Sequence, residues 1–229
     1  MRTPKTGSWS PRLRPGRSLL NVLTAVRPIA LALAAWFGVL LAAWGARADG
    51  LTPAEADRLA RAETVVRTES IERNGRRYVG GVAYAILDTS PADLEALLVN
   101  DEAWRRIMPK ARSACRVGTE GGDALVEMTH GTPLLQATYT IRVRREAHNV
   151  RFWLDPRRPH DIEDAWGFLR AVLRPDGRTL VTYGVLIDMG PGLLRDLFEE
   201  RVRAVALTVP DRVRDLLLER SATSVRASR

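Results

Sequence analysis

The stretch LLQATYTIRVRR, residues 134–145, constrains the fold more than any other part of the sequence. Its apolar and polar side chains alternate. Successive side chains of a β-strand point to opposite faces, so the pattern predicts a strand with one covered face and one face in water. The chain must therefore supply an apolar layer for one face of an antiparallel sheet. The alternating residues are Leu135, Ala137, Tyr139, Ile141 and Val143 on one side and Gln136, Thr138, Thr140, Arg142 and Arg144 on the other.

Further strands are predicted on both sides of this one. Asn74-Gly75 divides VVRTESIERNGRRYVGGVAYAIL into a hairpin with strands near 64–73 and 76–87, because this dipeptide favours a two-residue hairpin turn. Turn sequences such as GTEGGD and Pro175-Asp176-Gly177 separate the later runs. Those runs are 111–118, 123–130, 133–145, 149–155, 164–173 and 179–188, and in the last of them Val181, Tyr183, Val185 and Ile187 share one side.

Helical signals surround the strands. The segment 52–63 has a capping threonine and a proline in its first turn, and Ser90-Pro91 opens a second helix in the same way. Residues 101–109 form a third, short helix that ends at its proline. After Gly192 a long helix is expected, and Pro210 should kink or split it. Its apolar residues recur at helical spacing, namely Leu194, Leu197, Phe198, Val205, Val209, Val213 and Leu216.

The loop Gly190-Pro191-Gly192, between the last strand and this helix, has two interpretations. A phosphate-binding loop would need several backbone amides and, in the P-loop form, a lysine and a hydroxyl. This loop has no GK[ST] sequence, and Pro191 lacks an amide hydrogen. The favoured interpretation is a tight corner at which Pro191 starts the helix and lays its apolar face across the sheet.

The formal charge of +8 belongs to the N-terminus. Residues 1–48 contain no acidic residue, and removing their seven basic residues from the total of 35 leaves 28 basic against 27 acidic residues. The remainder has no excess charge to hold a polyanion, so nucleic acid is not an expected partner. The seven are Arg2, Lys5, Arg12, Arg14, Arg17, Arg27 and Arg47.

The same N-terminal region predicts export. PIALALAAWFGVLLAAW, residues 28–44, is an apolar run, and Ala46-Arg47-Ala48 after it fits a signal-peptide cleavage site. Residues 1–48 are therefore predicted to be a signal peptide, and the domain to be periplasmic or secreted. The alternative is an uncleaved membrane anchor through residues 28–44. The rest divides into a helical lead-in at 49–63, a domain at 64–220 and a polar, disordered tail at 221–229.

The order of these elements resembles the START-like (SRPBCC) superfamily, which includes polyketide cyclase/dehydrase and lipid-transport proteins. The resemblance rests on YVGGVAYAILDTSPADLEALLVNDEAWRRIMP, on DAWGFLRAVLRPDGRTLVTYGVLIDMGPGLLRDLF and on the helix to Glu219. It covers residues 64–219. It implies an α+β helix-grip fold, in which a curved antiparallel sheet wraps around a long C-terminal helix and leaves an apolar cavity. It also implies that the domain binds or transfers a hydrophobic small molecule, such as a lipid or an isoprenoid.

In such a fold, aromatic and methionine side chains would face the interior and contact the ligand, with ordinary core packing as the alternative for each. The C-terminal helix and the loop 155–164 would open to admit the ligand. The expected ligand-binding residues are Trp104, Met108, Met128, Tyr139, Phe152, Trp166, Phe168, Tyr183 and Phe198.

A non-catalytic binding protein is favoured, and no catalytic residue is assigned. The alternative is a cyclase, aromatase or hydrolase that uses the same cavity. Such an enzyme would draw first on His130, Tyr139, Tyr183 and Asp155, because acid–base catalysis needs titratable groups within reach of the substrate. A packed domain that acts through protein contacts is a third possibility.

Other polar residues give weaker indications. His148 lies in a polar turn, and His160 lies near carboxylates without the second histidine of a usual metal site. Arg151, Arg157 and Arg158 could meet an acidic lipid head group, although exposed arginines on a strand are the simpler interpretation. We expect neither a metal nor a cofactor. The sequence leaves transient membrane contact and the oligomeric state open.

Overall fold

The computed structural model describes residues 50–132 and 135–227. The predicted signal peptide or anchor lies outside the described residues, and so do the first two residues of the strand predicted at 133–145. Among the residues that are described, no helix combines the length and apolarity needed to cross a membrane.

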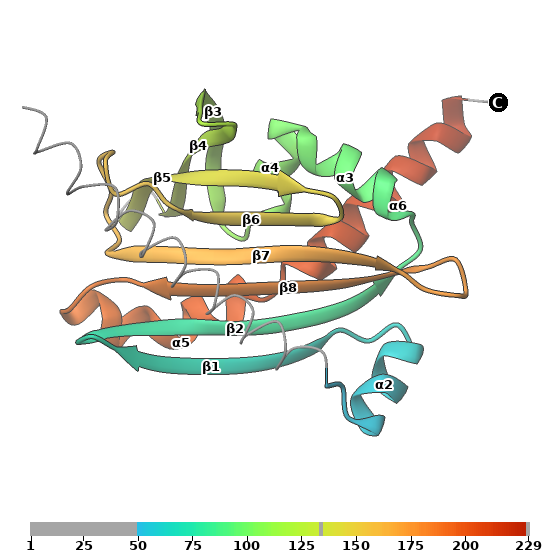
Figure 1. Cartoon of the computed structure of the whole chain (residues 1–229), viewed down its shortest axis with the longest axis horizontal. Helices are drawn as coiled ribbons and strands as arrows, with labels where there is room; N and C mark the ends of the chain where they lie inside the picture. The colour runs from blue at the N-terminus through green and yellow to red at the C-terminus, as the bar shows by residue number, and fades with distance from the viewer. Residues whose placement is uncertain (1–49, 133–134, 228–229) are drawn as a thin grey trace, which may run out of the picture. The chain divides into compact units, whose positions relative to one another are not determined.

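Within this part of the chain, eight strands form one antiparallel sheet (Figure 1). They lie in the order β1-β2-β8-β7-β6-β5-β4-β3. The strands predicted from alternation and turn signals are all present, with ends that differ by no more than two residues. Their bounds are Val65–Arg73 for β1, Arg76–Leu87 for β2, Ala111–Glu120 for β3, Asp123–Thr132 for β4, Leu135–Glu146 for β5, Asn149–Leu154 for β6, Asp164–Leu173 for β7 and Thr179–Asp188 for β8.

The hairpin between β1 and β2 has the predicted turn. Arg73 pairs with Arg76, so the loop consists of Asn74 and Gly75 alone. Both residues have positive φ, 51° and 73°, as a type I′ turn requires. The local sequence thus sets the register of the first strand pair.

The sheet has an inner face, which packs against the C-terminal helices, and an outer face. On β5 the predicted alternation is present: Ile141 and Val143 are buried in the core, whereas Arg142 and Arg144 bind carboxylates on the outer face. On β8, Val181, Tyr183 and Val185 belong to the same core. Because β4, β5, β6 and β8 all place their apolar residues inward, the inner face forms a continuous apolar surface.

Helices complete the core on the inner face, and Figure 1 shows α5 and α6 behind the sheet. α5 contacts β2, α6 contacts β2 and β8, α4 contacts β3, and α3 contacts β7. An antiparallel sheet closed by C-terminal helices is the helix-grip α+β arrangement that the resemblance implies. The bounds of these helices are Pro91–Val99 for α3, Asp101–Ile107 for α4, Leu193–Ala206 for α5 and Val209–Ala227 for α6.

The long C-terminal helix is split beside Pro210, as predicted. Pro210 is the second residue of α6, where a missing amide hydrogen breaks no helical hydrogen bond. Thr208 closes the end of α5, because its amide and its hydroxyl both donate to the Val205 carbonyl, at 3.1 and 2.8 Å.

The C-terminal tail differs from the prediction. α6 continues to Ala227, so the residues from 221 onward are helical as far as the structure describes them. Ser221 and Thr223 donate their hydroxyl groups to the carbonyls of Leu217 and Glu219, one turn earlier. These bonds satisfy the polar side chains within the helix, and the segment contains no glycine or proline that would end it.

The corner between β8 and α5 is also present, with one difference. Pro191 does not start the helix, because α5 begins at Leu193 and Gly192 is its N-cap. Gly190 has a φ of 79°, and its amide donates to Asp188 Oδ1 at 2.9 Å. Asp188 thus folds the chain back on itself, and the loop serves as a corner.

A short helix, α2, lies before the sheet at Pro53–Ala60. Thr52 caps its start, as predicted, and also forms a capping box with Glu55. Arg67 of β1 donates to Glu55 Oε1 at 2.8 Å, and the ion pair holds the pKa of Glu55 at about 2. This contact attaches the lead-in to the edge of the sheet.

Two aromatic rings lie over glycines of neighbouring strands, one on each face. A Cβ atom at Gly167 would lie 2.3 Å from the Phe152 ring on the inner face. A Cβ atom at Gly184 would lie 2.5 Å from the Phe168 ring on the outer face. The glycines therefore leave the space that lets each ring lie flat against the sheet.

Gly184→Ala is expected to lower the free energy of unfolding by about 1–2 kcal/mol, because the new methyl group displaces the Phe168 ring. In a Phe168→Leu background the same change should cost less, since the smaller side chain leaves room. Urea unfolding of the two single variants and the double variant measures this coupling. If the losses of unfolding free energy in the two single variants simply add in the double variant, the contact between position 184 and the Phe168 ring is contradicted.

Candidate functional site

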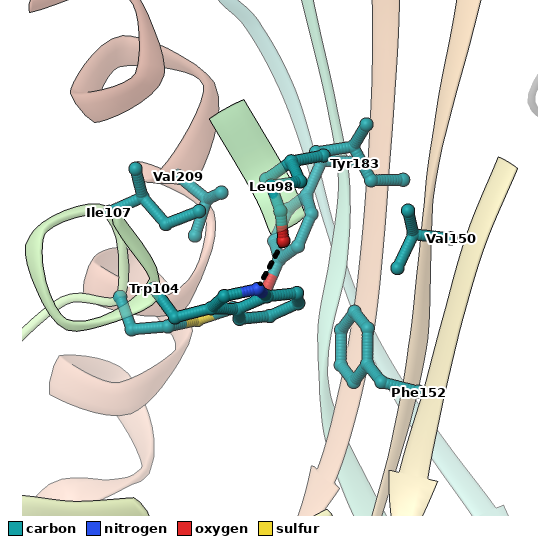
Figure 2. Close-up of a pocket in the computed structure, with 9 residues that line it drawn as sticks. Leu98, Trp104, Ile107, Val150, Phe152, Tyr183 and Val209 are labelled. Atoms are coloured by element: carbon teal, nitrogen blue, oxygen red, sulfur yellow. Dashed lines mark hydrogen bonds between the residues drawn. The ribbon is translucent and has the colours of Figure 1, made fainter. Parts of the chain in front are cut away.

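A small cavity lies between the sheet and the helices in the part of the chain that the structure describes (Figure 2). Trp104 and Ile107 of α4 face Val150, Phe152 and Tyr183 of the sheet across it. Its lining is apolar and aromatic, which suits an apolar occupant. The lining residues are Leu98, Trp104, Ile107, Met108, Val150, Phe152, Leu169, Tyr183 and Val209.

The cavity is small. Its volume is about 10 Å³, which is room for one water molecule at most. A hydrophobic ligand of any size must therefore displace side chains or move a helix.

The corner between α3 and α4 forms one wall. Asn100 ends α3 and caps α4, because its side-chain oxygen accepts from the Glu102 amide at 2.9 Å. Trp104 Nε1 donates to the Leu98 carbonyl at 2.7 Å, and Arg145 Nη2 of β5 donates to the same carbonyl at 2.8 Å. These two bonds hold the indole against the cavity and fasten the corner to the sheet.

Aromatic residues form the opposite wall. Phe152 and Tyr183 stack with ring centroids 6.1 Å apart. Burial raises the pKa of Tyr183, and the nearby Tyr139 raises it further. Burial raises the pKa of Tyr139 as well. Both phenols are therefore neutral at physiological pH and can act only as hydrogen-bonding groups.

Six of the nine predicted ligand-binding residues lie in the interior. Trp104, Met108, Phe152 and Tyr183 line the cavity, and Met128 and Tyr139 pack in the same core. Phe198 lies in α5, but its side chain is outside the described part of the structure.

Trp166 and Phe168 do not belong to the inner core that faces the helices, contrary to the prediction, although Phe168 is buried. They alternate along β7 with Leu169 and Ala171, which belong to the inner core. Phe168 instead covers Gly184 on the outer face, and Trp166 pairs with Trp153 of β6. Both faces of β7 are apolar, so its sequence alone does not reveal which set points inward.

Of the proposed catalytic candidates, His130 lies at the end of β4 on the face that carries Met128. Its ring stacks on Tyr139, with centroids 5.5 Å apart and planes 8° apart. Nδ1 lies 3.0 Å from the Pro109 carbonyl oxygen, whereas Nε2 is buried and has no partner among the described residues. Burial lowers the pKa of His130. The ring is therefore a neutral, half-satisfied polar group within an apolar region.

Lowering the pH is expected to destabilise the domain through His130. Its pKa is lowered in the folded state by burial, so the unfolded chain takes up a proton first as the pH falls below about 6.5. The contribution of neutral His130 to the free energy of unfolding is fully present above that pH. Below it the contribution is lost, by up to about 1.4 kcal/mol per pH unit for one such group. Urea unfolding between about pH 5 and pH 7.5 measures the slope.

His130→Asn should reduce this slope, because the variant has no ring to titrate. His148→Asn serves as the control, since His148 is exposed in the β5–β6 turn and binds Glu95. The same slope in His130→Asn and in the wild type would contradict the assignment.

Asp155, the remaining candidate, lies away from the cavity. It follows the inward-facing Leu154, so its side chain turns toward the outer face. There it accepts from Arg142 Nε at 3.3 Å and from Arg157 Nε at 3.2 Å. The carboxylate is 2% exposed and belongs to an ion-pair network that fastens the loop 155–164. It is therefore no partner for a ligand in this cavity.

The remaining polar candidates have local partners. His160 Nδ1 lies 2.7 Å from the Ile162 carbonyl oxygen within the loop, and His148 Nδ1 lies 2.7 Å from Glu95. Arg151 binds Glu146, and Arg157 binds Glu120. These contacts account for the side chains as parts of loops and of the outer face.

Sequence reasoning missed the aliphatic part of the lining. These residues lie at positions where any core residue would be apolar, so residue type alone did not mark them. The strand phase of Val150 in β6 was the available signal, whereas the phase of β7, which carries Leu169, could not be read from the sequence. The missed residues are Leu98, Ile107, Val150, Leu169 and Val209.

No family model and no curated protein matches this sequence. Solved structures do match the fold. The STAR-related lipid transfer protein of Xanthomonas axonopodis, fragment 25–204, aligns with a TM-score of 0.54 at 17% identity, over 67% of this chain and 93% of that one. The Zhui aromatase/cyclase of Streptomyces sp. R1128 gives a TM-score of 0.51 at 13% identity, over 71% and 98%.

TTHA0849 of Thermus thermophilus gives a TM-score of 0.52 at 13% identity, over 61% of this chain and 97% of that one. At such identities the likeness concerns the fold alone. The sheet order, the C-terminal helices and these likenesses agree. The chain has the START-like, helix-grip fold.

Proposed function

We propose that this chain is an exported domain that binds or transfers a hydrophobic small molecule, lipid-like or isoprenoid-like, between its sheet and its C-terminal helices. One observation carries the proposal: a small cavity with an apolar and aromatic lining lies where the sheet, α4 and α6 meet. Burying apolar ligand surface there would gain about 25 cal/mol per Å² removed from water. The solved lipid transfer protein of the same fold supports this use of the architecture.

The ligand must enter by opening this interior, because the cavity admits only about one water. The seam between α4 and α6 is the favoured gate. Ile107 and Val209 meet there from the two helices, and at the surface an ion pair joins Arg106 to Glu219. Both of its side chains are largely exposed, so the pair contributes at most about 1 kcal/mol and separates at little cost.

The loop 155–164, the other gate predicted from the sequence, is held more firmly. The Asp161 amide donates to the Thr138 carbonyl at 3.0 Å, and the Thr138 amide donates to Asp161 Oδ2 at 2.8 Å. Ile162 packs beneath the loop with Leu154 and Ala165. Opening at this end would break several hydrogen bonds and expose apolar surface.

An enzyme in the same interior is the second candidate. The stacked pair of His130 and Tyr139 favours it, because two titratable groups meet on the inner face. Asp155 does not join them. A binding protein therefore fits the arrangement better than an enzyme does. If the interior did not open to admit a ligand, the third possibility, a packed domain that acts through protein contacts, would apply instead.

Native mass spectrometry of the exported form, followed by extraction and identification of bound molecules, tests the proposal. A defined apolar mass that co-purifies would support it, and a protein mass that begins at Asp49 would support export with cleavage. A protein that is empty and also fails to take up added lipid would overturn binding. A full-length mass in the membrane fraction would favour the anchor over the signal peptide.

A further inference from the structure

We propose that the ligand carries a hydroxyl group and that His130 accepts its hydrogen bond through Nε2. This inference rests on the proposed function, because it specifies the chemistry of a ligand in the same interior. It begins from a polar atom that the fold leaves without a partner.

The hydrogen bond at Nδ1 fixes the tautomer of His130. Nδ1 lies 3.0 Å from the Pro109 carbonyl oxygen, and a carbonyl can only accept. Nδ1 therefore carries the hydrogen in the neutral ring. Nε2 then bears a lone pair and can only accept.

That lone pair is buried. Nε2 has no hydrogen-bond partner among the residues that the structure describes. Buried polar atoms are normally paired, and leaving one unpaired lowers the stability of the fold. A core that only packs would be more stable with an apolar residue at this position. A ligand site, in contrast, needs a hydrogen-bond acceptor that no protein group occupies.

The ring is held in place before any ligand arrives. Tyr139 stacks on it with centroids 5.5 Å apart and planes 8° apart, and Pro109 fixes its edge. An acceptor held from two sides loses little freedom when it forms a new bond, so binding retains more of the bond's free energy.

The surroundings select the kind of donor. Burial lowers the pKa of the ring, so it stays neutral and repels the oxygen lone pairs of a carboxylate head group. An amide would satisfy Nε2 but would bring a carbonyl that needs a partner of its own. A single hydroxyl on an apolar body adds the fewest unsatisfied atoms.

His130 and the cavity lie next to each other along the inner face. Met108 lines the cavity, and the following residue, Pro109, supplies the carbonyl that orients His130. On the other wall, Tyr139 lies close enough to Tyr183 to raise its pKa. An elongated ligand can thus place an apolar body against Trp104 and Phe152 and a hydroxyl end at His130.

A matched pair of probes tests this inference, namely 4-hexylphenol and its methyl ether, 4-hexylanisole. They are similar in shape, but only the phenol can donate. Isothermal titration calorimetry on the purified protein should show tighter binding of the phenol, by about five- to tenfold.

Two substitutions assign the preference to Nε2. His130→Asn retains a side-chain nitrogen near the position of Nδ1 for the Pro109 carbonyl but has no atom near Nε2, so the two probes should bind equally. His130→Gln can reach the position of Nε2 and should keep part of the preference. His148→Asn, in the exposed β5–β6 turn, should behave like the wild type.

The outcomes separate this inference from the proposed function. Equal binding of both probes to the wild type would overturn the hydroxyl assignment and leave hydrophobic binding standing. Failure of both probes to bind would overturn both proposals. Nitrogen-15 spectra of the three histidine rings give a second readout that needs no variant. The Nε2 signal of His130 should shift with the phenol and not with the ether, and the reverse would contradict the inference.

Discussion

Tyr183→Ala is expected to lower the free energy of unfolding by about 3–5 kcal/mol. Tyr183 is 3% exposed and packs against Phe152 and Val150 beside a cavity of about 10 Å³. Removing its ring would enlarge that cavity within a closely packed core, so the neighbouring side chains can collapse into the space only in part. Urea or thermal unfolding measures the loss.

Tyr183→Phe is the matched control, because it keeps the ring and removes only the hydroxyl group. We expect it to cost about 1 kcal/mol or less. Tyr183→Ala should also admit the probe 4-hexylanisole more readily, since the new space adjoins the existing cavity. A loss of stability below about 1 kcal/mol for Tyr183→Ala would mean that the interior is looser than its packing indicates.

Several elements could be predicted from the sequence because local chemistry determines them. Asn74 and Gly75 adopt positive φ at little cost, which fixes the first hairpin and its register. Pro210 cannot continue a helix from the preceding turn, which fixes the division between α5 and α6. In β5, alternation of apolar and charged residues leaves only one arrangement with the arginines in water.

The phase of β7 could not be predicted in the same way. Trp166 and Phe168 lie on one side of this strand, and Leu169 and Ala171 lie on the other. The two sets are similarly hydrophobic and either could cover a core, so alternation alone does not decide which set faces inward. The choice depends on space in the neighbouring strand, where Gly184 accommodates the Phe168 ring on the outer face.

The candidate site was only partly predictable for a related reason. The sequence placed His130 on the same face as Met128, but the bond from its ring to Pro109 depends on how α4 meets β3. Cavity volume depends on the rotamers of side chains from six elements, and no sequence pattern encodes it. Asp155 was named as a catalytic candidate because its carboxyl group can titrate. Its ion-pair partners, however, come from β5 and from its own loop.

Arg142→Met is expected to lower the free energy of unfolding by about 3 kcal/mol. The Arg142 side chain is 14% exposed and lies between two carboxylates that are almost fully buried, Asp123 at 3.4 Å and Asp155 at 3.3 Å. It also binds Glu120. Removing the cation would leave two buried anions with less compensation, and breaking a buried pair typically costs about 3–5 kcal/mol. The lower end applies here because Arg144 and Arg157 remain on the same carboxylates.

Arg144→Met is the control, since it removes the same charge from the neighbouring outward position of β5. The Arg144 side chain is 50% exposed, and Asp123 would keep Arg142, so the expected cost is about 1 kcal/mol. Hydrogen exchange adds a local readout: the amides of the loop 155–164 should exchange faster in Arg142→Met, because Asp155 is one of the loop's anchors to β5, beside Asp161. Equal losses of unfolding free energy in the two variants would show that stability here depends on net charge and not on the buried ion pairs. In that case the loop, rather than the seam between α4 and α6, would become the better candidate for the gate.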